Sequence, residues 1–110
     1  MSTLSKQVIG LSRRYVSKGS KENRRRQLRR MLLFVEWLET QEPGRDLAQL
    51  GKRHIINFWQ AHRHLTDKTR YEYWLALCVL WKLMEKPGKP PRPFVAVNNQ
   101  KTVQTSGYTL

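Results

Sequence analysis

The 110-residue sequence predicts an all-α fold in which four helices form one small bundle. Apolar residues recur three and four positions apart over most of the first 86 residues, which is the period of an amphipathic helix. Short stretches with serine, glycine or proline separate these periodic segments, and such residues begin or end helices. Four prolines between positions 87 and 93 exclude a further helix there. The sequence therefore predicts one helical domain over residues 1–93.

The first predicted helix covers residues 4–16. Its apolar positions are spaced four, three and four residues apart and comprise Leu4, Val8, Leu11 and Tyr15. Gly10 weakens this helix because glycine has a low helix propensity. A polar break at residues 17–20 follows, and Ser20 is predicted to cap the next helix.

The second predicted helix covers residues 21–41 and has the clearest amphipathic pattern. Its apolar stripe consists of Leu28, Met31, Leu32, Val35 and Leu38. Charged residues occupy the other side, and Trp37 lies off the stripe, which predicts partial exposure of its ring. Pro43 and Gly44 end the helix, because neither residue continues it without cost.

Two more helices are predicted after a loop that contains Leu47 and Leu50. Residues 52–64 form the third helix, whose broad apolar face consists of Ile55, Ile56, Phe58 and Trp59. Residues 67–86 form the fourth, with Thr66 as its N-cap. The apolar arc of this last helix is too wide for a surface helix, so we expect it at the centre of the bundle.

The end of the chain changes character. Residues 94–97 (FVAV) are compatible with a short extended piece. The remaining polar residues predict that 94–110 form an extended, flexible tail.

The composition indicates a polyanion as the partner. The chain carries 21 Lys+Arg against 8 Asp+Glu, for a formal charge of +13, and a single cysteine. One cysteine excludes an internal disulfide, and no apolar run is long enough to span a bilayer. No secretory signal is visible, so we expect a soluble protein in the cytoplasm, associated with the nucleoid in a bacterium. Basic domains of this kind most often bind nucleic acid.

The cations are concentrated near the N-terminus. Ten of the 21 basic residues lie within the first 30 positions, where Glu22 is the one acid. Arginine offers a bidentate fork to phosphate or to guanine, so this segment predicts a DNA-binding face. A solvated helix face is the alternative. The predicted DNA-binding residues of this segment are Arg13, Arg14, Lys21, Arg24, Arg25, Arg26, Arg29 and Arg30.

Two helix starts are further candidates for phosphate contact, because free backbone N–H groups there attract anions. Lys52 and Arg53 open the third helix, with His54 beside them, and Lys68, Thr69 and Arg70 open the fourth. The alternative at the fourth helix is simple N-capping by Thr66.

Catalytic, metal and cofactor chemistry is not indicated. The histidines lack further ligands at metal spacing, and Cys78 falls in an apolar stripe without a base nearby, as a buried and inert thiol would. Core packing is favoured over base stacking for three tryptophans: Trp59, Trp74 and Trp81. Tyr108 lacks the groups that would activate a tyrosine nucleophile. We therefore expect no enzyme, no metal and no cofactor.

Several segments together resemble a known family. They are residues 33–38 (LFVEWL), 50–59 (LGKRHIINFW) and 65–70 (LTDKTR), followed by a proline-rich exit. Over residues 8–93 this order resembles the N-terminal core-binding domain of tyrosine recombinases, the phage-integrase family. The resemblance implies a four-helix SAM-like orthogonal bundle that forms one half of a clamp around duplex DNA.

In that family the other half of the clamp is a larger catalytic domain, and too few residues follow position 93 to form it. The resemblance therefore implies DNA binding without strand cleavage, in site-specific recombination or the regulation of a mobile element, with a recombinase as a possible protein partner. Two alternatives stay open. One is an RNA-binding protein, and the other is a helical adaptor whose basic face docks an acidic protein.

Overall fold

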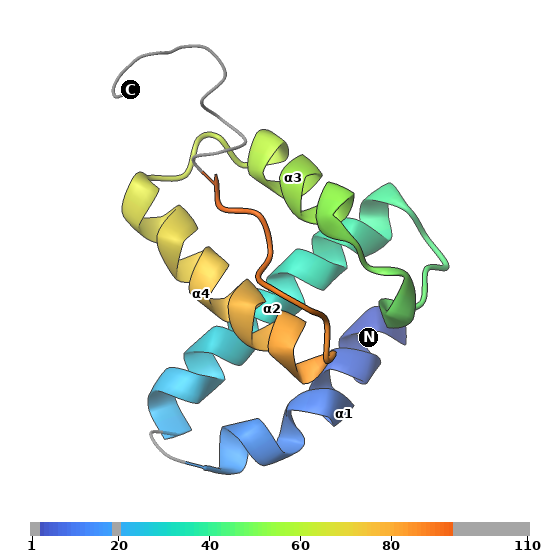
Figure 1. Ribbon diagram of the computed structural model, residues 1–110, viewed down its shortest axis with the longest axis vertical. Coiled ribbons are helices and arrows are strands. Elements are labelled where there is room, and N and C mark those ends of the chain that lie inside the picture. The colour runs from blue at the N-terminus through green and yellow to red at the C-terminus, as the bar shows by residue number, and fades with distance from the viewer. Residues whose placement is uncertain (1–2, 19–20, 94–110) are drawn as a thin grey trace.

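The computed structural model describes residues 3–18 and 21–93. It has four α-helices and one short 3-10 helix, and no strand occurs in the described residues, so the predicted all-α four-helix bundle is confirmed (Figure 1). The elements are α1 (Thr3–Ser17), α2 (Lys21–Gln41), η1 (Leu47–Gln49), α3 (Lys52–Ala61) and α4 (Asp67–Leu83). The predicted N-cap Ser20 and the predicted tail, residues 94–110, lie outside the described residues.

Helices α1 and α2 run antiparallel along one side of the bundle, and α4 crosses α2 (Figure 1). The buried apolar side chains come from every element, and α2 and α4 supply most of them. Phe34 and Val35 of α2 are fully buried, as are Ile55 and Trp59 of α3. Helix α4 was predicted to be central and has five buried residues, but α2 is the helix that packs closely against α1, α3 and α4, so α2 holds the central position.

The inward face of α1 differs from the predicted stripe. Leu11 is 39 % exposed, whereas Ser5 and Ser12 are completely buried beside Leu4 and Val8. Serine has a small side chain, so Ser12 lets α1 approach α2 closely. The Ser12 hydroxyl donates to the Met31 sulfur, 4.0 Å away. The prediction for Leu11 was wrong because a count of apolar residues cannot assign a serine to a helix interface.

The two later helices end three residues before the predicted boundaries. Helix α3 stops at Ala61. Helix α4 closes with two overlapping hydrogen bonds, from the Glu85 N–H to the Lys82 carbonyl and from the Lys86 N–H to the Trp81 carbonyl. Glu85 has a positive φ of 58°, the left-handed conformation that this type of helix end requires.

Residues 86–93, which we call the proline strap, pack back against the bundle. The indole N–H of Trp81 donates to the Pro87 carbonyl at 3.2 Å, and the indole N–H groups of Trp74 and Trp59 donate to the carbonyls of Pro90 and Pro91 at 3.0 Å each. The predicted core packing of these three tryptophans is confirmed, because all are at most 4 % exposed. Trp37 is half-buried, also as predicted.

Candidate nucleic-acid interface

The first half of α2 presents a row of cations to solvent. Its apolar residues, among them Met31 and Val35, face the core, so the residues between them point outward. Lys21, Arg25 and Arg29 follow one another at four-residue intervals and are all exposed. Residues four apart lie on one side of a helix, so this row extends about 12 Å along α2.

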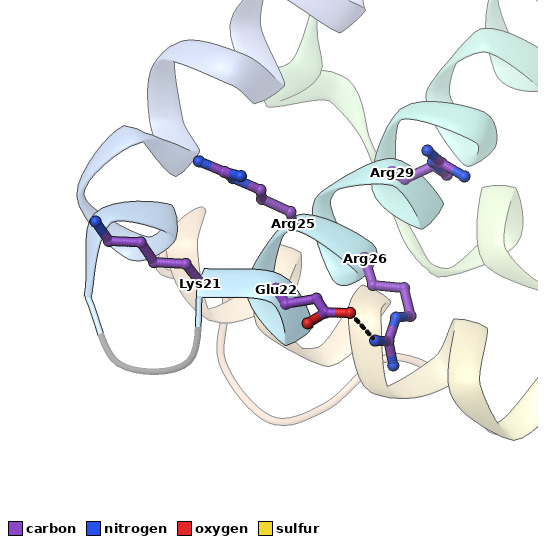
Figure 2. A pocket seen from close by; sticks show the side chains of 5 residues that line it. All are labelled: Lys21, Glu22, Arg25, Arg26 and Arg29. Atoms are coloured by element: carbon purple, nitrogen blue, oxygen red, sulfur yellow. Dashed lines mark hydrogen bonds and ion pairs between the residues drawn. The ribbon is translucent and has the colours of Figure 1, made fainter.

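A shallow hollow of about 530 Å³ lies on this surface. Lys21 and Arg25 extend to one side, and Arg26 and Arg29 extend to the other (Figure 2). The hollow is lined by Lys21, Glu22, Arg25, Arg26 and Arg29. We call the four basic residues among them the α2 basic surface.

One acid is present on this surface, and it engages a single arginine. The Glu22 carboxylate lies 3.4 Å from the Arg26 guanidinium, and both side chains are more than half exposed. An exposed pair of this kind contributes about 0–1 kcal/mol, since water screens it. Lys21, Arg25 and Arg29 have no ion-pair or hydrogen-bond partner in the described part of the chain.

Two of the predicted DNA-binding arginines of α2 are directed at neighbouring helices instead. Arg24 donates to the Tyr15 carbonyl at 2.9 Å, and its guanidinium lies 4.4 Å from the centre of the Tyr15 ring. Burial raises the pKa of the Tyr15 hydroxyl, and the Arg24 charge opposes part of that rise. Arg30 forms a 3.0 Å ion pair with Glu72 of α4. These two arginines join α2 to α1 and α4.

The end of α1 adds two cations at the same end of the molecule. Arg13 and Arg14 are exposed in the last turns of α1, which adjoin the first turns of α2 (Figure 1). A hydrogen bond between the Tyr15 hydroxyl and Gln27 joins the two helices here. The structure thus brings the cations of α1 and α2 together.

The start of α3 lies elsewhere. Its first turn adjoins the C-terminal end of α2, and the length of α2 places it about 30 Å from Lys21. Arg53 donates to both carboxylate oxygens of Glu42, at 2.8 and 3.1 Å, and Arg45 approaches the same carboxylate at 2.9 Å. Lys52 remains exposed beside this cluster.

These contacts hold the pKa of the Glu42 carboxyl at about 2, chiefly through the hydrogen bond from Arg53. Glu42 is therefore anionic at neutral pH and compensates the arginines around it. The tight pairing ties the loop after α2 to the start of α3.

His54 is the residue of this cluster whose role the sequence did not reveal. It is 3 % exposed, and its Nδ1 accepts a hydrogen bond from the Gly51 N–H at 2.9 Å. Because Nδ1 is an acceptor, the ring proton of the neutral form lies on Nε2, which faces Glu42 at 3.5 Å. The position of His54, three residues after the helix cap, was the one signal for this capping role.

The start of α4 combines capping with one exposed cation. Thr66 caps the helix by accepting from the Thr69 N–H at 3.1 Å, as predicted, and its hydroxyl also contacts the Thr69 hydroxyl. Arg70 pairs with Asp67. Lys68 is exposed and has no such partner in the described residues.

The thiol of Cys78 is half-buried, and burial raises its pKa, which reduces the thiolate fraction.

Among residues 3–18 and 21–93, no group of three or more His, Cys, Asp or Glu could hold a metal ion. None of the helices in those ranges is both long and apolar enough to cross a membrane. The chain matches no protein-family model, no curated protein and no solved structure.

Proposed function

We propose that this chain is a non-catalytic DNA-binding protein that grips duplex DNA through the α2 basic surface and the end of α1. The observation that carries the proposal is the exposed row formed by Lys21, Arg25 and Arg29, which has no acidic partner in the described residues. Like charges in such a row repel one another until a polyanion neutralises them.

The dimensions of the row suit a duplex. The major groove of B-DNA is about 12 Å wide, and the row extends over about the same distance along α2. Cations at its two ends can therefore reach phosphates on both sides of the groove. Arg13 and Arg14 extend the basic surface beyond α2.

Contacts of this kind position a protein on DNA and supply affinity that depends little on sequence. The resemblance of residues 8–93 to recombinase core-binding domains supports a role for this binding in DNA recombination or in the control of a mobile element. A cytoplasmic location, at the nucleoid in a bacterium, follows from the same proposal.

The proposal is tested by the salt dependence of binding to a random duplex, measured by fluorescence anisotropy. If five cations without an ion-pair partner in the described residues contact phosphates, namely Arg13, Arg14, Lys21, Arg25 and Arg29, log affinity falls with log salt with a slope of about −4.5. The double variant Arg25→Glu/Arg29→Glu removes two of them, so we expect a slope of about −2.7 and an affinity at least tenfold lower. Circular dichroism shows whether the variant is folded.

The matched control is Lys52→Glu, which reverses an exposed charge at the far end of α2. It should change duplex affinity less than twofold. The proposal fails if the wild-type chain does not bind duplex DNA even at low salt. It also fails if structured RNA displaces the duplex at 150 mM salt, which the RNA-binding alternative requires.

A further inference from the structure

A second surface lies where the first turns of α4 meet the proline strap. Tyr71 is 46 % exposed and is one of the three large hydrophobic side chains that are exposed in the described residues. It borders a mainly apolar hollow of about 400 Å³. The other residues that line this hollow are Asp67, Lys68, Arg70 and Pro93.

The tyrosine ring stands on a rigid base. Its centre lies 5.9 Å from that of Trp74, and the two ring planes differ by 32°. Trp74 is 4 % exposed and is fixed by its hydrogen bond to the Pro90 carbonyl. The Arg92 guanidinium lies 4.3 Å from the Trp74 ring centre. Tyr71 is thus supported from within the protein while nearly half of its surface is open.

The charges around the ring are predominantly positive. Lys68 is exposed on the rim of the hollow, and Lys89 lies 5.9 Å from the Trp74 ring centre. The one acid that lines the hollow, Asp67, is paired with Arg70. An exposed aromatic ring with cations nearby matches a nucleobase with its phosphates, since bases stack on aromatic side chains while basic residues follow the backbone.

This surface and the α2 basic surface lie on two helices that an ion pair joins. The ion pair between Arg30 and Glu72 joins α2 and α4 one turn beyond Arg26 and one turn beyond Lys68. From this junction the first turns of α4 extend to the upper left and those of α2 to the lower left in Figure 1. A single nucleic-acid ligand can therefore contact both surfaces.

We propose that Tyr71 stacks on an unpaired nucleobase, so that the preferred ligand is DNA with a single-stranded segment next to a duplex. The inference rests on the proposed function, because the duplex is held by the α2 basic surface. It adds a preference for the structure of the DNA that phosphate contacts alone do not provide.

The test compares a blunt duplex with the same duplex carrying a ten-thymidine 3′ or 5′ overhang, at one salt concentration. Stacking of a base on an aromatic side chain is worth about 1–3 kcal/mol, so Tyr71→Ala should weaken binding to the overhang substrate by about 5- to 140-fold. Tyr71→Phe keeps the ring and should bind the overhang substrate within about twofold of wild type. Binding of the blunt duplex should be the same for all three proteins.

Leu11→Ala is the control, because it truncates an exposed apolar side chain of α1. It should leave the preference for the overhang substrate intact. The inference is overturned if wild type binds both substrates equally, or if Tyr71→Ala keeps the preference. It is also overturned if Tyr71→Phe loses the preference together with Tyr71→Ala, since stacking does not need the hydroxyl.

The failure of the proposed function has a different signature. If Arg25→Glu/Arg29→Glu leaves blunt-duplex binding unchanged, the α2 basic surface is not the duplex site. The inference about Tyr71 then falls with it, even where an overhang is preferred. If the surface at Tyr71 instead binds an apolar peptide, no overhang preference appears, and the inference is again overturned.

Discussion

Basic residues lie near both ends of α2, but a neighbouring acid engages them very differently at the two ends. At the N-terminal end, Glu22 is 88 % exposed and contacts one arginine at 3.4 Å. At the C-terminal end, Glu42 is 23 % exposed and holds Arg45 and Arg53 at 2.8–2.9 Å, with His54 at 3.5 Å. The position of a single carboxylate thus decides whether a group of cations is compensated or left available.

The difference has a physical origin in hydrogen bonding and exposure. Glu42 accepts two hydrogen bonds from one guanidinium, and charge-assisted bonds of this bidentate type are stronger and better oriented than single contacts. Glu22 competes with water for one contact on an exposed helix face. A high local count of arginines is therefore a poor guide to binding until their partners are known.

The largest expected effect comes from removing the acid at the compensated end. Glu42→Gln leaves Arg45 and Arg53 without their anionic partner, so the chain should unfold at a lower urea concentration. The same change should create a new basic surface. In the Arg25→Glu/Arg29→Glu background, Glu42→Gln should restore part of the duplex binding and make the salt slope steeper by up to about 1.8. If a folded variant recovers no duplex binding, Glu42 does not keep Arg45 and Arg53 from binding DNA.

The next effect is the dependence of stability on pH. The pKa of the Glu42 carboxyl is about 2 in the folded chain, below its ordinary value of 4.5, chiefly because Arg53 donates to the carboxylate. The folded state therefore binds this proton more weakly than the unfolded state. The stabilisation from Glu42 is complete above pH 4.5 and is lost as the pH falls toward 2.

We therefore expect the difference in urea midpoint between wild type and Glu42→Gln to be large at about pH 6 and small at about pH 2.5. Urea titrations monitored by circular dichroism at several pH values measure it. A difference that stays constant over this range would show that the Glu42 charge does not stabilise the fold.

The smallest effect is expected at the exposed acid. Glu22→Gln frees Arg26, so the salt slope of duplex binding should become steeper by about 0.9 and the affinity should rise a few-fold. Stability should change by less than about 1 kcal/mol, as is usual for an exposed pair. Glu36→Gln, an exposed acid in the second half of α2, is the control and should leave the slope unchanged. Equal effects of the two substitutions would mean that net charge, and not the pairing of Arg26, governs binding.

Much of the fold followed from local sequence. The period of apolar residues located all four helices, because amphipathicity is a property of consecutive residues on one helix. The Thr66 cap was predictable for the same reason, since a cap and its partner lie three residues apart. The prediction for Leu11 failed, because Ser12 occupies the buried position instead. A serine fits there because its side chain is small, and a pattern of apolar residues does not detect this.

The candidate surface was only partly predictable. The concentration of cations before position 30 identified the start of α2, and the row of Lys21, Arg25 and Arg29 follows from helical geometry alone. The sequence did not separate these residues from Arg24 and Arg30, which lie on the same helix. Their partners, Tyr15 and Glu72, lie on other helices, and Glu72 is 42 residues after Arg30 in the chain.

By itself, then, the sequence determined where helices form, that three tryptophans are buried and that α2 begins in a concentration of positive charge. The tertiary structure decided which of those charges remain free, how the indole groups bind the proline strap, and that Tyr71 stands exposed beside Lys68. The reason is that these two sets of features depend on interactions over different distances along the chain. Helix periodicity and capping act over a few residues, whereas ion pairs and indole-to-carbonyl hydrogen bonds depend on how the helices pack.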